Sequence, residues 1–466
     1  MEVANVLGVP VAYATSLIVL GLGAAAVLAG RRAASIISIT VSAIITLLAN
    51  GDAVCRSWLA VVNAPVCMGL DTVSKLFAAL SALVAITVIV YAGRAGVTCR
   101  GGEAVFEIVV TAIHASVIGL VYAYSLPLFY VFWELVLIVS TVLVWLWSPR
   151  RAPEFFIYMH AGSLLLLVAV GALLAANAPV FGGNVVDASL STIALPLALI
   201  AFAIKLGVFP FHTWLPRTYT SVPPFAAGLL AGVVTSIGAY GMYRFTTGFH
   251  WPHQTTAMLE AAMWLGITSA IVGALRALSA NRLGFIASYS SIGHSGIIYA
   301  GLAAGHPLAA AGGVLAALAH GIVKPLFFLV AGVLEKQSGS DDIRSMGVFA
   351  RSMPVTAFAA FVAAMSLAGA PPFAMFPGEL LIVLGVGRVY GIAAVAALAL
   401  AVLSSAAYAL RFWLRVFWHP SVTVPRTLPS EAPSRLLVPL LILAAAAIAL
   451  GVLPGPIVDS IVSLIR

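Results

Sequence analysis

Charged residues are scarce in this sequence. Only 8% of its 466 residues are charged, whereas 62% are hydrophobic. A soluble domain usually has about 25% charged residues, which it needs to cover its surface. The composition therefore excludes a water-soluble globule and a disordered chain. It also excludes a nucleic-acid-binding protein, although the formal net charge is +8.

Long polar segments are missing as well. The longest polar interruptions, near residues 50–71, 94–102, 335–353 and 419–435, are too short to form a soluble domain. We therefore expect no cofactor in this chain, so any redox chemistry belongs to another subunit. The first apolar run, 11–30, has no basic residue before it, and for this reason a cleavable signal peptide is not expected.

What the sequence has instead is a succession of apolar runs. Each run has about 20 residues, enough to cross a bilayer as an α-helix. The runs predict an all-α polytopic membrane protein with about fourteen transmembrane helices. We expect these spans near residues 10–29, 33–50, 71–92, 104–121, 125–147, 155–176, 192–215, 225–245, 257–279, 283–303, 307–334, 354–386, 391–416 and 436–453.

The distribution of Lys and Arg orients these spans. Loops on the cytoplasmic side of a membrane protein are enriched in basic residues. Most basic loop residues here follow odd-numbered spans, and Arg244 is one of the few assigned to the opposite side. This pattern places both termini outside the cytoplasm. We expect the chain in a plasma membrane or an equivalent energy-transducing membrane.

Cysteine is rare, with three residues in the chain. The orientation puts Cys55 and Cys67 in one external loop, where a disulfide would persist. Two readings stay open for this pair, a disulfide and two unpaired thiols. Cys99 falls on the cytoplasmic side. No Cys/His spacing matches a metal site, so we expect no bound metal.

The lysines occupy unusual places. The chain has four, and Lys75, Lys205 and Lys324 fall inside spans, while the loops use arginine almost exclusively. A charge at the bilayer centre costs about 2.5–3.5 kcal/mol, and such residues commonly mark ion pathways. Lysine can give up its proton, whereas arginine stays charged. The pattern favours proton-carrying lysines, although Lys75, close to the helix-capping Asp71, is also placed to snorkel toward the interface.

The first half of the chain combines an acidic residue, a lysine and a helix break. Glu134 lies in the middle of a span, and Lys205 lies five residues before Pro210, with His212 following. Proline removes a backbone donor and breaks a helix. Broken membrane helices commonly mark ion sites. We therefore predict that the span near 192–215 is broken close to Pro210.

The second half repeats this combination. His294 continues a stripe of serines in its span, and His320 and Lys324 are four residues apart, so they share one helix face. A break at Pro371-Pro372 in the span near 354–386 is then followed by Glu379. Two halves of opposite orientation, with sites at the midplane, are a common transporter architecture.

We therefore expect two inverted five-helix repeats, each with a proline-broken helix. The predicted organisation is an N-terminal three-helix segment (1–103), a first inverted repeat (104–250), a second inverted repeat (251–418) and a C-terminal helix (419–466). Protons that move sideways need titratable groups at similar depth. We expect the order Glu134, Lys205, His294 or Lys324, and Glu379, with neighbours within about 10 Å.

Several motifs resemble the antiporter-like subunits shared by respiratory complex I, Mrp-type cation/proton antiporters and membrane-bound hydrogenases. In family order, they are FYVFWELVLI, AFAIKLGVFPFHTWLP, ASYSSIGHSG, LAHGIVKPLFF and AGAPPFAMFPGEL, within residues 71–415. The resemblance implies that Glu134 and Lys205 form a gating ion pair. It also implies that Lys324 with His320 is the central relay and that Glu379 is the exit group. A glutamate at that last position is more similar to the middle antiporter-like subunit of complex I and to some hydrogenase subunits.

The sequence departs from this family in three places. The loop after the seventh span reads PRTYTSVP and lacks the usual acidic and histidine members. The segment before the tenth span reads RLGF in place of the usual DLKR. The eighth span has Thr235-Ser236 where the family often has a relay lysine. Water bridged by Thr235, Ser236 and His294 would replace that lysine, or the subunit transports poorly.

The resemblance thus implies a proton-translocating subunit of a redox-driven membrane complex. Its partners would be other membrane and soluble subunits together with lipid. Two alternatives stay open, a sodium/proton antiporter subunit of the Mrp type and a non-conducting scaffold subunit.

Overall fold

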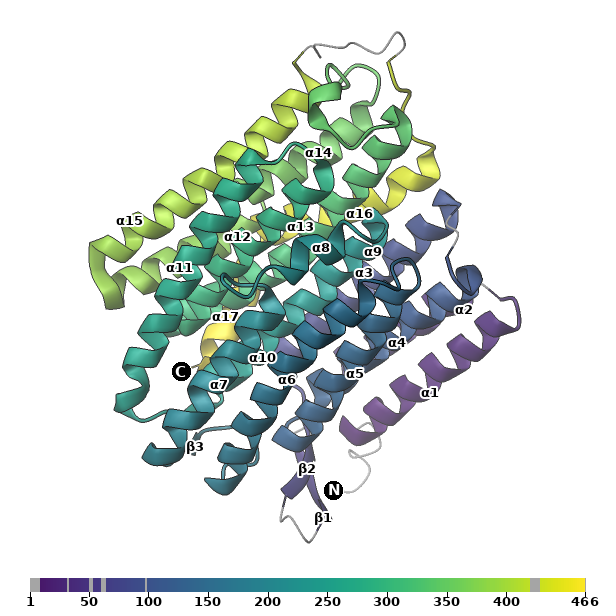
Figure 1. Ribbon diagram of the computed structural model, residues 1–466. Coiled ribbons are helices and arrows are strands. Elements are labelled where there is room, and N and C mark those ends of the chain that lie inside the picture. Colours follow the sequence, from purple (N-terminus) through teal and green to yellow (C-terminus); the bar gives the residue numbers. More distant parts are fainter. Residues whose placement is uncertain are drawn as a thin grey trace. The chain divides into compact units, whose positions relative to one another are not determined.

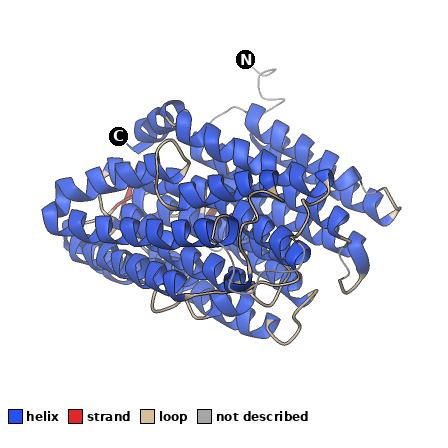
Figure 2. Ribbon diagram, turned by 90° about the horizontal axis from the view of Figure 1, so that it is seen from above, coloured by secondary structure: helices blue, strands red, loops and turns tan. Residues whose placement is uncertain are grey.

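The computed structural model describes residues 9–31, 33–49, 53–59, 64–96, 99–419 and 428–465 (Figure 1). Helices form nearly all of this part of the chain, as Figure 2 shows, so the all-α prediction is confirmed. The helices that cover the expected spans are α1 (Val9–Leu28), α2 (Ala33–Leu48), α3 (Thr72–Ala95), α4 (Gly102–Tyr122), α5 (Leu126–Trp145), α6 (Ala152–Ala175), α7 (Ala188–Leu206), α8 (Trp214–Tyr219), α9 (Pro224–Leu229), α10 (Thr235–Thr247), α11 (Thr256–Ser279), α12 (Leu283–Ala303), α13 (Pro307–Ser338), α14 (Pro354–Leu367), α15 (Met375–Phe417) and α16 (Ser434–Val452).

Every expected span overlaps one of these helices or a pair of them. Within the described ranges, 11 helices are long and apolar enough to cross a membrane, and α2 and α14 are shorter. A π-helical turn, η2 (Leu230–Val234), joins α9 to α10. Gly391, with a φ of 72°, interrupts α15 between two of the expected spans. The helix α17 (Gly455–Ile465), which follows α16, was not expected.

Both predicted helix breaks are present. The helix α7 ends at Leu206 and α8 begins at Trp214, so the break surrounds Pro210. In the same way, α14 ends at Leu367 and α15 begins at Met375, around Pro371-Pro372. Each break opens with a glycine at positive φ, Gly207 at 70° and Gly369 at 65°. Glycine adopts this conformation without a steric penalty, and proline then prevents the helix from resuming.

The chain folds as two compact units. The first contains Met1–Ile89, Val97–Lys205 and Tyr240–Met258, and the second contains Val90–Gly96, Leu206–Ala239 and Leu259–Arg466. These units differ from the predicted organisation, because residues 206–239 of the expected first repeat belong to the second unit. The inverted relation of the repeats stays a prediction.

In the first unit, α1 packs on α2 and α4, α4 packs on α5, and α5 packs on α6. The strands β1 (Val54–Leu59) and β2 (Ala64–Met68) form an antiparallel hairpin with Cys55 opposite Cys67. A disulfide joins these two cysteines. The short strands β3 (Asn184–Val185) and β4 (Phe249–His250) pair in parallel. The hairpin and the paired strands β3 and β4 lie in the connections between helices.

Arg244 was assigned to an external loop, and this assignment is wrong. It lies within α10, is 6% exposed, and forms an ion pair with Asp71. The rings of Tyr124 and Phe181 each lie 4.8 Å from its guanidinium carbon. Asp71 also caps α3 as expected, because its carboxylate accepts a hydrogen bond from the Ser74 amide (2.7 Å). A partly exposed carboxylate and aromatic faces thus hold this arginine inside the protein.

The second unit is organised around α13. This helix packs against α9, α12, α14, α15 and α16, and its most apolar stretch is completely buried. Small residues allow this crowding. A Cβ on Gly312 would lie 2.7 Å from the carbonyl oxygen of Gly378 on α15, so only glycine fits there. Side chains in the middle of α13, including Lys324, therefore face protein and not lipid.

Candidate functional site

Lys205 is the centre of a polar cluster in the first unit. It lies in the last turn of α7 and is 4% exposed. Its ammonium lies 3.9 Å from the ring centroid of Trp133 on α5, which is a cation–π contact. The indole N–H of Trp133 in turn donates to the Ser163 hydroxyl on α6 (3.0 Å). The indole ring is therefore held in place beneath the ammonium.

Glu134 has its own partners in this cluster. Its carboxylate accepts a hydrogen bond from the Tyr130 hydroxyl (2.8 Å) and lies 3.5 Å from Nδ1 of His160. No ion pair joins Glu134 to Lys205 in the part of the chain that the structure describes. The ion pair implied by the resemblance is therefore not formed in this structure. The sequence analysis missed Tyr130 and His160, although Tyr130 lies four residues before Glu134 and so shares its helix face.

His212 lies inside the break between α7 and α8. It is half-buried, and its ring lies 5.4 Å from the ring of Phe209. Its carbonyl oxygen accepts a hydrogen bond from the Leu215 amide (3.0 Å), which forms a turn at the start of α8, where Thr213 is the N-cap residue. Within the described ranges, Nδ1 of its ring has no hydrogen-bond partner.

Lys324 is the centre of a second cluster, in the second unit. Its side chain is fully buried and donates to the Ser290 hydroxyl and to the Ala287 carbonyl oxygen (3.3 Å), both on α12. His320 precedes it by one turn of α13 and is 1% exposed. Considering only the described residues, Nε2 of His320 has no hydrogen-bond partner.

His294 connects the α12 side of this cluster to the break after α14. Its Nδ1 lies 2.9 Å from the Ser290 carbonyl oxygen, and its Nε2 lies 3.2 Å from the Leu367 carbonyl oxygen. Leu367 ends α14, and the last carbonyls of a helix have no partner within the helix. The break thus supplies an acceptor for the imidazole.

Glu379 completes this cluster. It is 4% exposed, and its carboxylate lies 3.8 Å from Nε2 of His294. Neither carboxylate oxygen accepts a hydrogen bond from the described residues. A Cβ on Gly369 would overlap the carboxylate, so the glycine at the break also makes room for Glu379.

Thr235 and Ser236, predicted as bridging residues, have partners in the second unit. The Thr235 hydroxyl forms a hydrogen bond with the Tyr219 hydroxyl (2.7 Å), and the Ser236 hydroxyl donates to the Ala317 carbonyl oxygen on α13 (3.5 Å). Tyr219 belongs to the loop that departs from the family pattern. The sequence analysis noted this loop for the residues it lacks and missed the tyrosine it contains.

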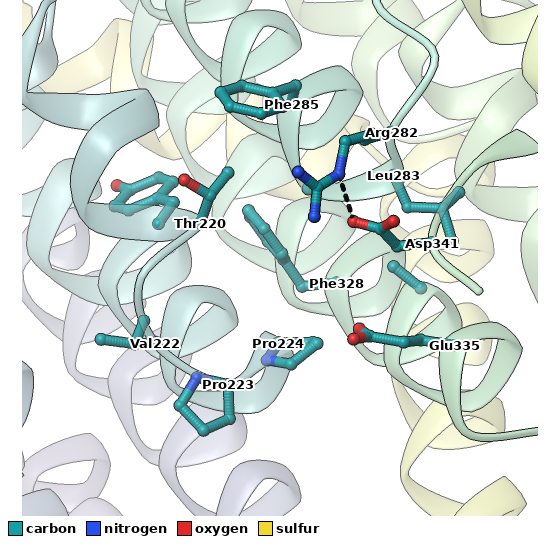
Figure 3. Close-up of a pocket in the computed structure, with 13 residues that line it drawn as sticks. Thr220, Val222, Pro223, Pro224, Arg282, Leu283, Phe285, Phe328, Glu335 and Asp341 are labelled. Carbon is teal, nitrogen blue, oxygen red and sulfur yellow. Dashed lines mark hydrogen bonds and ion pairs between the residues drawn. The ribbon is translucent and has the colours of Figure 1, made fainter. Parts of the chain in front are cut away.

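A cavity of about 270 Å³ lies beside Tyr219 in the second unit (Figure 3). Arg282 and Asp341 line it and form an ion pair (2.7 Å), drawn as the dashed line. Glu335 and Phe328 of α13 line it as well. Arg282 begins the segment that replaces the family's DLKR, and its pair with Asp341 ties the start of α12 to the loop after α13.

Two further buried ionisable residues lie on α4. Glu107 accepts a hydrogen bond from the Ser35 hydroxyl (2.7 Å), and Nδ1 of His114 lies 3.0 Å from the Ser81 hydroxyl. The sequence analysis missed both, although ionisable residues within the expected span 104–121 were the available signal. No group of three His, Cys, Asp or Glu residues able to hold a metal occurs among the described residues.

The comparisons with known proteins agree on one family. The transmembrane family described as NADH:quinone oxidoreductase/Mrp antiporter matches residues 123–404. NADH-quinone oxidoreductase subunit M of Pseudomonas aeruginosa is 30% identical over 428 residues, which cover 86% of this chain and 82% of that protein. The subunit of the same name from Escherichia coli is 26% identical over 425 residues, with the same two coverages of 86% and 82%.

Solved structures share the fold. A chain of respiratory complex I from Thermus thermophilus matches with a TM-score of 0.84 at 25% identity, covering 97% of this chain and 100% of that one. The Mrp complex from Dietzia sp. matches with a TM-score of 0.81 at 22% identity, covering 100% and 97%. The archaeal membrane-bound sulfane sulfur reductase matches with a TM-score of 0.82 at 23% identity, covering 96% and 76%.

Proposed function

Because the chain belongs to the NADH:quinone oxidoreductase/Mrp antiporter family of membrane proteins, we propose that it is a proton-translocating subunit of a redox-driven membrane complex. One observation carries this proposal. The second unit encloses a lysine, a histidine and a glutamate, and contacts of hydrogen-bond or near-hydrogen-bond length connect them to their neighbours. Buried ionisable groups are costly, and they persist in membrane proteins where protons or ions pass.

In this proposal, the cluster around Lys205 controls the protonation of that lysine, and the cluster around Lys324 passes a proton onward to Glu379. Closing Glu134 onto Lys205 would stabilise the charged lysine by about 4 kcal/mol at ~4 Å and an effective dielectric of ~20. In the open arrangement, the cation–π contact with Trp133 replaces part of that stabilisation. The proton then reaches Glu379 by way of Lys324 and His294.

The chain would work among other subunits. The relatives that it matches are named as subunits of an oxidoreductase, so we place electron transfer and its cofactors in partner membrane and soluble subunits. The chain itself contacts lipid through its exposed apolar helix faces. We place it in the plasma membrane or an equivalent energy-transducing membrane. Both termini would lie outside the cytoplasm, because basic residues concentrate in the loops after odd-numbered spans.

The test replaces Lys324 in the assembled complex. Inverted membrane vesicles are supplied with NADH and a quinone, and lumen acidification is followed together with electron transfer. We expect Lys324→Met to reduce acidification to less than about a tenth of the wild-type rate, since it removes an essential proton carrier. The matched control is Lys336→Met, at an exposed position on the same helix, which retains wild-type acidification.

Two outcomes would contradict the proposal. Normal acidification by the Lys324→Met complex would favour the non-conducting scaffold. Sodium/proton exchange by vesicles without an electron donor would favour the antiporter subunit of the Mrp type.

A further inference from the structure

Lys324 and His294 lie in the same cluster without touching. Within the described part of the chain, no hydrogen bond joins the ammonium to the imidazole. The ammonium ends on the Ser290 hydroxyl, whereas the imidazole contacts the carbonyl oxygen of the same serine. A proton that leaves Lys324 for His294 therefore needs an intermediate group.

Tyr408 is placed to supply that group. It lies on α15, is 1% exposed, and was not considered in the sequence analysis. Its hydroxyl lies 3.4 Å from Nδ1 of His294, and the side chains of Ser405 and Ser290 lie beside it. One buried hydroxyl thus approaches both the group that receives the Lys324 ammonium and the imidazole.

We propose that the hydroxyls of Ser290 and Tyr408 form the proton link from Lys324 to His294. This inference rests on the proposed function. The Lys324 ammonium passes one proton to the Ser290 oxygen, Ser290 passes its own proton to the Tyr408 oxygen, and Tyr408 passes its own proton to Nδ1 of His294. The products are a neutral lysine, two intact hydroxyls and an imidazolium. The Ser290 hydroxyl donates to the Ala287 carbonyl oxygen (2.9 Å) in this structure, so it rotates toward Tyr408 before the transfer.

The same geometry allows His294 to hold both protonation states. A carbonyl oxygen only accepts hydrogen bonds. The neutral imidazole that receives the proton donates from Nε2 to the Leu367 carbonyl oxygen and accepts from Tyr408 at Nδ1, so its ring first turns Nδ1 away from the Ser290 carbonyl oxygen, which lies 2.9 Å away in this structure. The imidazolium donates from Nε2 to Leu367 and from Nδ1 to the Ser290 carbonyl oxygen. Without the Tyr408 hydroxyl, the neutral form would leave a buried acceptor unsatisfied, which costs about 1–3 kcal/mol.

The charged groups around His294 favour onward transfer. Among the described residues, the ionisable groups that face it are Lys324 and His320 of α13 and Glu379 and Tyr408 of α15, and α14 contributes the Leu367 carbonyl oxygen. Once His294 is protonated, its Nε2 proton moves to the Glu379 carboxylate, now 3.8 Å away. A small side-chain rotation brings these two atoms within hydrogen-bond distance.

The test removes the hydroxyl and keeps the ring. In the vesicle assay, we expect Tyr408→Phe to assemble, to retain electron transfer and to lower acidification about tenfold, because a proton-transfer step is lost. Tyr408→Leu, which also removes the ring, should acidify no better than Tyr408→Phe. Tyr299→Phe on α12 removes another buried tyrosine hydroxyl (1% exposed) and is the matched control with wild-type acidification.

A second variant separates a proton link from packing. Ser290→Ala should cause a similar loss, and the Ser290→Ala/Tyr408→Phe double variant should be no worse than the stronger single variant, because both interrupt one path. If Tyr408→Phe does not assemble, Ser290→Ala alone decides. Multiplying losses in the double variant would overturn the link, as would wild-type acidification by Tyr408→Phe or by Ser290→Ala.

Failure of this inference can be told apart from failure of the proposed function. If Lys324→Met stops acidification while Tyr408→Phe acidifies normally, only the hydroxyl link is wrong. If Lys324→Met acidifies normally, the proposed function itself is wrong.

Discussion

The clusters around Lys205 and Lys324 use the same residue types in different ways. Both lysines are buried, and each cluster contains a glutamate. Lys205, however, rests on the face of Trp133, a contact without directional hydrogen bonds, whereas Lys324 donates to a hydroxyl and a carbonyl oxygen. The cation–π contact sets no direction for the Lys205 N–H groups, whereas two acceptors orient those of Lys324, a difference that supports the proposed roles of gate and relay.

The two glutamates also differ in their surroundings. Glu134 is partly exposed, accepts a hydrogen bond from Tyr130 and lies 3.5 Å from His160, whereas Glu379 is enclosed and lies close to His294. The break before Glu379 shapes its site through Gly369 and the Leu367 carbonyl. At the other break, the atoms nearest to Gly207 belong to the flexible Leu215 side chain. The comparison indicates that the break between α14 and α15 helps to form the site around Glu379.

The largest effect should come from Gly369→Ala. The new Cβ would overlap the Glu379 carboxylate, and the residue has a φ of 65°. A positive φ costs a non-glycine residue about 1–2 kcal/mol, and overpacking adds about 1–3 kcal/mol. Thermal unfolding of the complex and vesicle acidification measure both consequences, and we expect acidification to be nearly abolished.

Gly305→Ala is the matched control for this substitution. Its φ is 64°, and a Cβ there would meet nothing within 4 Å, so it carries the backbone cost alone. Gly207→Ala, with a φ of 70°, should fall between the two, since Leu215 can move. Equal losses for Gly305→Ala and Gly369→Ala would break the comparison.

A smaller effect should follow from Trp133→Leu. It removes the aromatic face under Lys205, which is worth about 2 kcal/mol at a desolvated site. We expect acidification to fall several-fold, with Trp133→Phe intermediate because a phenyl ring keeps a weaker cation–π contact. Trp264→Leu, at a position that is 37% exposed, controls for the loss of an indole. An unaffected Trp133→Leu complex would show that the ring does not hold the lysine.

The smallest effect should come from Tyr130→Phe. It removes one hydrogen bond to the Glu134 carboxylate, worth about 1.5–3 kcal/mol because the acceptor is charged. Since His160 still faces the carboxylate, we expect acidification to change less than about threefold, which corresponds to less than 1 kcal/mol. Tyr390→Phe on α15 is the control. A loss as large as that of Lys324→Met would show that Tyr130 is itself a proton carrier.

The helix breaks and the buried lysines could be predicted because their causes are local. Pro210 and Pro371-Pro372 lack a backbone N–H, and each break also contains a glycine at positive φ. Proline alone does not suffice, because Pro325 lies inside α13. A lysine within an apolar run can likewise be recognised from the residues next to it in the sequence. The disulfide stayed one of two readings, because spacing alone does not show that β1 and β2 place Cys55 opposite Cys67. Arg244 was misplaced because its burial depends on Asp71, a partner 173 residues away in sequence.

The sequence by itself determined that this chain is an all-helical membrane protein with broken helices and a few titratable residues in apolar surroundings. The length of an apolar run, the presence of proline and the free-energy cost of a buried charge are properties of each segment by itself. The tertiary structure decided which groups meet. Trp133 beneath Lys205, Ser290 and Tyr408 between Lys324 and His294, and Gly369 beside Glu379 are juxtapositions of different helices. Hydrogen bonds and cation–π contacts act over a few ångströms, so only the packing of those helices can bring their partners within reach.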